Sequence, residues 1–105
     1  MNILFICSRN KKRSATAEFI FRHHPNHSIQ SAGTADSAVR RVSERLLLWA
    51  DIIFVMEKRH REILRERYNT AIENKTIITL DIPDEYEFMD EELVQMLTDT
   101  VTPYL

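Results

Sequence analysis

Glycine and cysteine are almost absent from this sequence, since its 105 residues include only one of each. The single cysteine, Cys7, cannot form an internal disulfide, and it lies far from any cysteine-rich metal spacing. An excess of charge is also missing, because 14 basic residues against 16 acidic ones leave a formal net charge of -2. This balance argues against a nucleic-acid-binding protein with a broad basic face.

Long hydrophobic runs are missing too. None approaches the roughly 20 residues needed to span a bilayer, so we expect no membrane partner. The apolar run at residues 1–6 has neither a basic n-region nor a small-residue cleavage site, so we do not expect it to be a signal peptide. The sequence therefore predicts a reduced, cytoplasmic protein. Its length predicts a single domain over residues 1–105, with 44% hydrophobic residues to form one core.

Short apolar runs alternate with helical spacing along the whole chain. The runs predict strands at residues 3–6, 28–31, 52–56 and 76–80, of which the first, third and fourth are expected to be buried. Apolar residues at offsets of three and four predict helices at residues 14–22, 42–49, 58–68 and 90–100. Strict alternation of this kind predicts an α/β fold with a four-stranded parallel sheet flanked by helices.

Two groups of polar residues follow predicted strands. Cys7 comes directly after the first strand, while Asp81 and Asp84 come after the last. Ligands of parallel sheets bind at the carboxyl ends of the strands, so we expect all three side chains at the same edge of the sheet. Gly33, in Ser31-Ala32-Gly33-Thr34, is expected to provide a positive φ that other residues avoid.

The loop after the first strand carries the predicted chemistry. It reads Cys7-Ser8-Arg9-Asn10-Lys11-Lys12-Arg13-Ser14, with cysteine and arginine six positions apart and a helix expected to begin at Ser14. The thiolate is the reactive form of cysteine, and the helix N-terminus, the loop N–H groups and Arg13 would all stabilise that anion. The same N–H groups can bind phosphate oxygens, two of which Arg13 can clamp with its planar fork.

The other loop residues are expected to bind substrate or to support the loop. Ser14 can donate its hydroxyl to the Cys7 sulfur, and Asn10 tolerates left-handed backbone. Ser8 completes the binding loop, and three cations around its mouth would attract acidic or multiply charged phosphorylated substrates: Arg9, Lys11 and Lys12. A buried, inert thiol is the alternative, since cysteine is often buried. The strand before the loop and the helix after it favour the functional interpretation.

A carboxylic acid on the opposite loop could protonate a leaving group. Asp84 is the first candidate and Asp81 the second, although both could be ordinary surface or capping carboxylates. Tyr86 and Phe88 follow these acids and could either line the pocket or anchor the loop to the core. The histidines around Pro25 lack a carboxylate or cysteine at useful spacing, so no metal site is predicted.

Several segments resemble the low-molecular-weight protein tyrosine phosphatase family, in that family's order. They are Ile3-Leu4-Phe5-Ile6-Cys7, Asn10, Arg13-Ser14, Ala17-Glu18, Ser31-Ala32-Gly33-Thr34, Ala50-Asp51-Ile52-Ile53, Met56 and Ile82-Pro83-Asp84-Glu85-Tyr86. The resemblance implies a flavodoxin-like fold and a cysteinyl-phosphate intermediate, with no metal or other cofactor. The compact outline is most similar to a short bacterial branch of predicted tyrosine phosphatases. Transferred to this sequence, the family resemblance implies Cys7 as nucleophile, Arg13 as phosphate clamp and Asp84 as general acid. It also implies that Asn10 and Ser14 support the loop.

The sequence departs from the family pattern at four places. Arg9 stands where the family usually has a small residue, Lys12 where a second cysteine is frequent, and Glu85 where a proline is normal. The stretch from Gly33 to Asp51 is shorter than usual, so the wall that holds a substrate's aromatic ring is expected to be reduced.

We therefore expect a phosphomonoester hydrolase, specifically a protein tyrosine phosphatase acting on a phosphorylated protein or a small phosphomonoester. The alternative is a non-catalytic module that binds phosphate or phosphopeptides. Arsenate reduction would need further cysteines, and nucleic-acid binding would need aromatic residues among the basic ones. The sequence predicts no oligomeric state.

Overall fold

The computed structural model describes residues 1–105 and confirms the alternation of strands and helices. The strands are β1 (Asn2–Cys7), β2 (Ser28–Gly33), β3 (Ile52–Val55) and β4 (Thr76–Thr79). The helices are α1 (Arg13–Phe21), α2 (Glu44–Trp49), α3 (Lys58–Ile72) and α4 (Glu91–Val101), followed by a 3-10 turn, η1 (Thr102–Tyr104). None of these helices combines the length and the apolar character that crossing a membrane requires.

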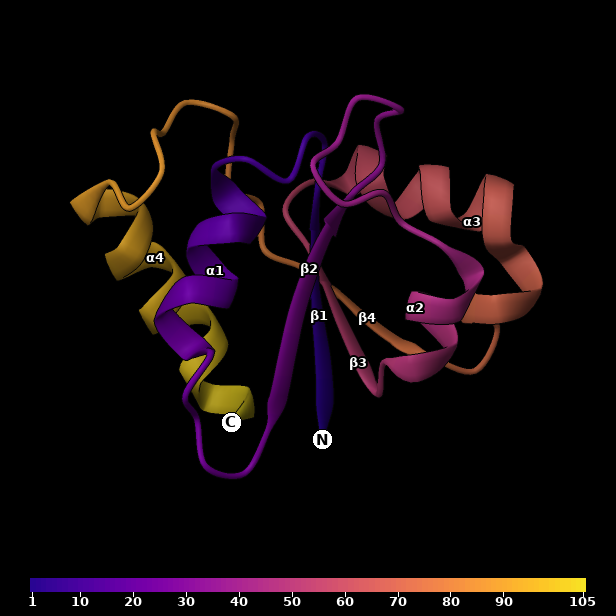
Figure 1. Cartoon of the computed structure of the whole chain (residues 1–105), viewed down its shortest axis with the longest axis horizontal. Coiled ribbons are helices and arrows are strands. Elements are labelled where there is room, and N and C mark those ends of the chain that lie inside the picture. The colour runs from indigo at the N-terminus through magenta and orange to yellow at the C-terminus, as the bar shows by residue number, and fades with distance from the viewer.

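The four strands form one parallel sheet in the order β2-β1-β3-β4. Helices α1 and α4 cover one face, and α2 and α3 cover the other (Figure 1). This arrangement is the predicted flavodoxin-like architecture. The chain moves from β1 to β2 through α1 and then returns to β3 through α2, so strand order reverses between β1 and β3. In such sheets the ligand crevice opens at the carboxyl ends of those two strands.

Strand β1 is the most enclosed element of the sheet. Its side chains alternate between two core clusters: Leu4 and Ile6 face the α2–α3 side, whereas Ile3, Phe5 and Cys7 face the α1–α4 side. None of these five residues is more than 3% exposed. Because burial on both faces fixes the register of a strand, β1 holds the Cys7 backbone in a defined position at its carboxyl end.

Two expectations about the second half of the chain need correction. Strand β4 is not buried, because it is an edge strand that pairs only with β3, and its residues are exposed or half-buried. Helix α3 extends beyond the predicted residue 68 to Ile72 through a kink at Tyr68, where φ is -134° and ψ is 35°. The Tyr68 hydroxyl donates a hydrogen bond to the Val42 carbonyl at 3.2 Å, which ties the kink to the segment before α2.

The expectation for Gly33 was also wrong, since no glycine in the structure has a positive φ. Gly33 instead ends β2 in close contact with the Cys7–Ser14 loop. A Cβ atom at this position would lie 2.4 Å from the Ser8 carbonyl oxygen and 2.7 Å from the Ala38 Cβ. Glycine is therefore required here by the close approach of three backbone segments.

Gly33→Ala is expected to destabilise the protein by about 2 kcal/mol or more, because the added methyl group must displace backbone rather than a flexible side chain. Urea unfolding of wild type and variant measures the difference. Ser37→Ala, in the loop that follows, is the control and should leave the free energy of unfolding almost unchanged. An unchanged midpoint for Gly33→Ala would contradict the close contact.

Candidate active site

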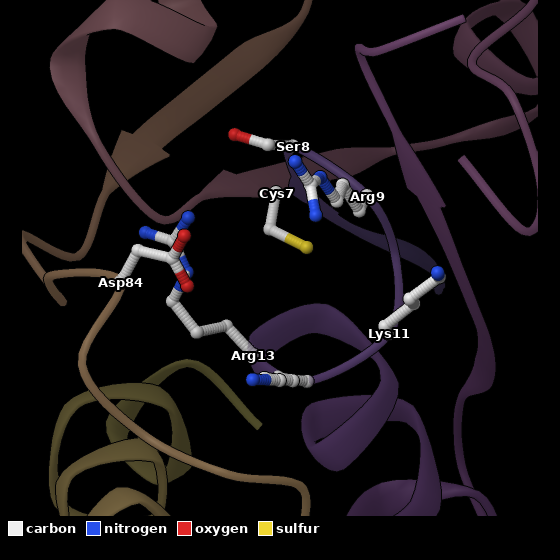
Figure 2. A pocket seen from close by; sticks show the side chains of 7 residues that line it. Cys7, Ser8, Arg9, Lys11, Arg13 and Asp84 are labelled. Carbon is white, nitrogen blue, oxygen red and sulfur yellow. Dashed lines mark ion pairs between the residues drawn. The ribbon is translucent and has the colours of Figure 1, made fainter. Parts of the chain in front are cut away.

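A small cavity of about 90 Å³ opens at the carboxyl end of β1 (Figure 2). Seven residues line it: Cys7, Ser8, Arg9, Lys11, Lys12, Arg13 and Asp84. Six of them belong to the predicted loop, and Asp84 reaches the cavity from the segment after β4. The structure thus brings together the two polar groups that the sequence placed at one edge of the sheet.

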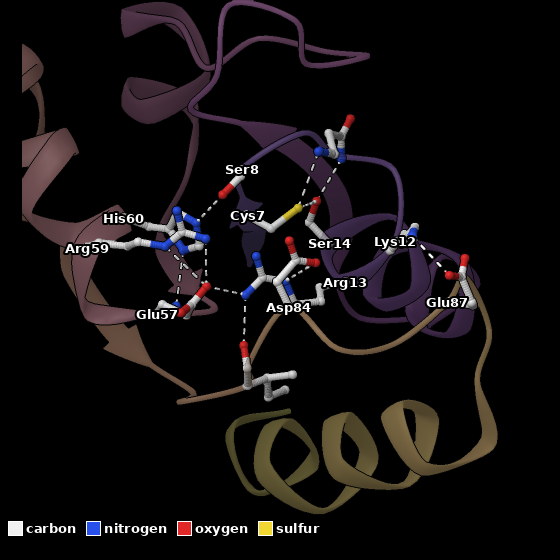
Figure 3. Close-up of polar contacts among 12 residues, drawn as sticks. Cys7, Ser8, Lys12, Arg13, Ser14, Glu57, Arg59, His60, Asp84 and Glu87 are labelled. Atoms are coloured by element: carbon white, nitrogen blue, oxygen red, sulfur yellow. Dashed lines mark hydrogen bonds and ion pairs between the residues drawn. The ribbon is translucent and has the colours of Figure 1, made fainter.

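The Cys7 sulfur is buried and accepts hydrogen bonds from the loop. The Asn10 backbone N–H lies 3.3 Å from Sγ, and the Ser14 hydroxyl oxygen lies 3.0 Å from it (Figure 3). Asn10 has the predicted left-handed backbone, with φ at 58°. This conformation turns the Asn10 amide toward the sulfur, where a donor stabilises negative charge.

A chain of buried hydrogen bonds orients the Ser14 hydroxyl. The Ser31 hydroxyl donates to Glu18 Oε1 at 2.6 Å and accepts from Asn10 Nδ2 at 2.8 Å. Asn10 Nδ2 also donates to Ser14 Oγ at 2.8 Å. Since Ser14 Oγ accepts this bond, its own hydrogen is available either to the Cys7 sulfur at 3.0 Å or to the Ala32 carbonyl at 3.4 Å.

Arg13 is 1% exposed, and only one edge of its guanidinium group makes hydrogen bonds. Its Nη1 donates to Glu57 Oε1 at 2.6 Å and to the Ile82 carbonyl at 2.8 Å, so both of its hydrogens are used (Figure 3). The N–H groups on the edge formed by Nε and Nη2 make no hydrogen bond, and Asp84 Oδ1 lies 3.8 Å from Nε. That edge has the geometry to clamp two phosphate oxygens.

Glu57, directly before α3, neutralises the buried Arg13 and was missed by the sequence reasoning. Burial alone would raise the pKa of Glu57, but hydrogen bonds from Arg13 and Arg59 outweigh it and hold that pKa below its usual value. Arg59 Nη2 lies 3.0 Å from the same Oε1 that Arg13 contacts. The carboxylate therefore stays ionised at neutral pH and fixes the guanidinium beside the cavity.

His60, in the first turn of α3, connects Glu57 to the loop and was also missed. Its Nδ1 accepts from the Glu57 backbone N–H at 3.1 Å, so its proton must lie on Nε2, which is 2.9 Å from Ser8 Oγ. Burial, and then the nearby charges of Arg13 and Arg59, lower the pKa of His60 to about 4. The neutral ring donates to Ser8 and leaves the Ser8 hydrogen free for a ligand.

The low pKa of His60 predicts a pH-dependent stability. In the unfolded chain the pKa of the ring lies near its ordinary value of 6.5, so protonation favours unfolding between pH 6.5 and pH 4. The contribution is present above pH 6.5 and is lost as pH falls toward 4, amounting to up to about 3 kcal/mol. In urea unfolding, the stability advantage of wild type over His60→Gln should narrow across this window. A stability advantage that stays constant with pH would contradict the low pKa of His60. His23→Gln serves as the control.

Other candidate residues lie outside the cavity. Asp81 has a left-handed backbone, with φ at 57°, and borders a separate hollow beside Lys58 and Arg65. Tyr86 packs against the core cluster on the α1–α4 side, while Phe88 contacts Phe19 with ring centroids 5.8 Å apart. Tyr86 therefore fits the expected anchor to the core, whereas Phe88 is exposed and packs on the exposed Phe19 of α1.

No family model matches the chain. The curated low-molecular-weight protein-tyrosine-phosphatase Wzb of Escherichia coli (strain K12) is 37% identical over an 89-residue alignment that covers 62% of this chain and 60% of Wzb. The Wzb of Escherichia coli O157:H7 gives the same values. The chain thus matches less than two thirds of the length of these curated relatives.

Solved structures resemble the whole chain. The tyrosine phosphatase Wzb from Escherichia coli K30 in complex with phosphate has a TM-score of 0.79 and 25% identity, covering 98% of this chain and 94% of Wzb. Vibrio vulnificus Wzb in complex with benzylphosphonate has a TM-score of 0.78 and 25% identity, with coverages of 98% and 95%. The YwlE arginine phosphatase from Geobacillus stearothermophilus has a TM-score of 0.76 at 20% identity, covering 98% and 92%, and shares the fold.

The fold and the loop together define a class: a flavodoxin-like α/β protein with a buried cysteine in a loop at the point where strand order reverses. Within that class, the chain is similar in sequence and in structure to the low-molecular-weight protein tyrosine phosphatases named Wzb.

Proposed function

We propose that this chain is a phosphomonoester hydrolase of the protein tyrosine phosphatase type, acting through a cysteinyl phosphate on Cys7. The observation that carries the proposal is the arrangement of three groups around one small cavity: the Cys7 thiol, the free edge of Arg13 and the Asp84 carboxyl. We also propose a single functional domain over residues 1–105, in a cytoplasmic setting. Its substrate would be a phosphorylated protein or a small phosphomonoester.

In the first step the Cys7 thiolate attacks phosphorus, so that an S–P bond forms as the P–O bond to the leaving group breaks. The loop N–H groups and the Nε/Nη2 edge of Arg13 bind the remaining phosphate oxygens. Asp84 gives its proton to the leaving oxygen, which departs as a neutral hydroxyl group. Ser8 and three cations would complete the binding loop: Arg9, Lys11 and Lys12.

In the second step water attacks the phosphorus of the intermediate and Asp84, now a carboxylate, takes the proton of that water. The S–P bond breaks, and inorganic phosphate leaves. The hydrogen bonds from Ser14 Oγ and the Asn10 N–H, at 3.0 and 3.3 Å, stabilise the departing thiolate. The residues that bind sulfur in the resting protein thus favour its release.

Asp84 is a better acid candidate than Asp81 because it borders the cavity and its side chain is 61% exposed, which leaves it free to reach a leaving group. Asp84→Asn should lower kcat by about 100-fold or more with phenyl phosphate, whose leaving group needs a proton. The loss should be much smaller with 2,4-dinitrophenyl phosphate. Asp81→Asn is the matched control and should retain wild-type rates, whereas equal losses for both substrates would contradict the acid role.

A non-catalytic phosphate-binding module is the second candidate, favoured by the cavity's lack of an aromatic wall. The deciding experiment is steady-state hydrolysis of para-nitrophenyl phosphate, alongside thermal unfolding with and without inorganic phosphate. Turnover by wild type supports the hydrolase. If wild type is inert and phosphate still raises its Tm, the binding module is the correct function.

A further inference from the structure

Arg9 and Lys11 are the charged residues of the cavity wall that have no opposite charge beside them. Lys12 pairs with Glu87 at 3.0 Å, and Arg13 pairs with Glu57 at 2.6 Å and Asp84 at 3.8 Å. Arg9 and Lys11 are exposed, and their side chains make no hydrogen bond or ion pair. In the view of Figure 2 both lie on the opposite side of the Cys7 sulfur from Asp84.

These two cations exceed what one phosphate group needs. The scissile phosphate would be bound by the loop N–H groups and the free edge of Arg13, next to the sulfur it must reach. Arg9 and Lys11 stand further out, at the mouth of the loop, where the rest of the substrate would lie. Their uncompensated charge therefore acts on the substrate's leaving group and its surroundings.

The cavity offers little to an apolar leaving group. Cys7 is its one hydrophobic residue, and the nearby aromatic side chains are engaged elsewhere, Phe88 against Phe19 and Tyr86 against the core. An aromatic ring would bury little apolar surface here and gain correspondingly little free energy. An anionic group near two free cations would gain Coulomb energy, although solvent screens it.

We propose that Arg9 and Lys11 form an anion subsite beside the catalytic cavity, and that the substrate carries a second anionic group, a phosphate or a carboxylate, close to the scissile phosphate. This inference rests on the proposed function and adds to it a class of substrate. It also predicts discrimination against phosphoarginine, because the guanidinium of that substrate would lie beside two cations.

The test compares two substrates of similar shape, 4-carboxyphenyl phosphate and 4-carbamoylphenyl phosphate, which differ by one negative charge. For wild type, kcat/KM should be about tenfold higher for the carboxylate, as expected for two exposed charge pairs. The ratio should fall toward one in Arg9→Gln/Lys11→Gln, whatever its absolute rate. It should also fall at high salt, which screens exposed charges.

Arg45→Gln/Arg65→Gln is the matched control. It removes the same two charges at exposed positions whose side chains make no polar contact and do not border the cavity, so the ratio should persist. Equal kcat/KM for the two substrates in wild type would overturn the subsite while leaving the hydrolase intact.

If wild type hydrolyses neither substrate, the hydrolase itself fails, and calorimetric binding decides the subsite. Pyrophosphate should then bind wild type about tenfold more tightly than inorganic phosphate, and this advantage should vanish in Arg9→Gln/Lys11→Gln. Equal affinities of wild type for the two anions would overturn the proposal.

Discussion

Cys7→Ser should lower the hydrolysis of para-nitrophenyl phosphate roughly a thousandfold or more, because it removes the nucleophile that we propose forms the intermediate. The serine hydroxyl would occupy the position of the thiol, at the buried carboxyl end of strand β1. It is a far weaker nucleophile, and no general base adjoins it: the hydrogen-bond partners of Sγ are the Asn10 N–H and the Ser14 hydroxyl.

The same variant should still fold and bind phosphate. Its urea midpoint should stay close to that of wild type, and inorganic phosphate should still raise its Tm, since the loop N–H groups and Arg13 remain. Retention of wild-type turnover by Cys7→Ser would show that the covalent mechanism is wrong. The urea midpoint and the phosphate-dependent Tm distinguish this loss of chemistry from a rate loss caused by unfolding.

Arg13→Lys should lower kcat/KM by about 100-fold or more, although it preserves the charge. One ammonium group cannot bind Glu57 and the Ile82 carbonyl while also clamping two phosphate oxygens, as the guanidinium would in the proposed function with its two edges. The measurement is steady-state hydrolysis of para-nitrophenyl phosphate, together with the affinity for inorganic phosphate.

Arg59→Lys is the matched control for this substitution. Arg59 also contacts Glu57 Oε1, at 3.0 Å, but it is exposed and does not border the cavity. Its replacement should change kcat/KM by no more than about threefold. If Arg13→Lys behaves like Arg59→Lys, the planar fork of Arg13 has no special role and charge alone suffices.

Local physics made much of the fold predictable. The apolar run before Cys7 and the helical spacing after Ser14 gave the strand–loop–helix unit, because periodicity reports directly which faces are buried. Asn10 was correctly expected to adopt a left-handed backbone, since few residues other than glycine tolerate it.

Features that depend on tertiary neighbours were harder to predict. The exposed character of β4 follows from its place at the sheet edge, which the sequence of one strand does not encode. The role of Gly33 depends on the Ser8 carbonyl and on Ala38, which approach it only in the folded chain. The backbone is left-handed at Asp81, three residues before Asp84, and this turn separates the two acids. The pattern of side chains in the sequence does not reveal such a turn.

Glu57 and His60 were missed because a carboxylate and a histidine at a helix start are typical of ordinary capping residues. Their capping role is real, since each accepts a hydrogen bond from the backbone of the other. The usable signal was position: they follow β3, which pairs with β1 where strand order reverses, and residues after both strands border the same crevice.

The proposed covalent mechanism is tested by detecting the cysteinyl phosphate itself. Wild type and Asp84→Asn would be mixed with excess para-nitrophenyl phosphate, quenched rapidly and digested, and the peptide containing Cys7 examined by mass spectrometry. We expect the added mass of a single phosphoryl group on Cys7, and none on that peptide from Cys7→Ser. Turnover by wild type without that mass, or with the phosphoryl group on another residue, would contradict it.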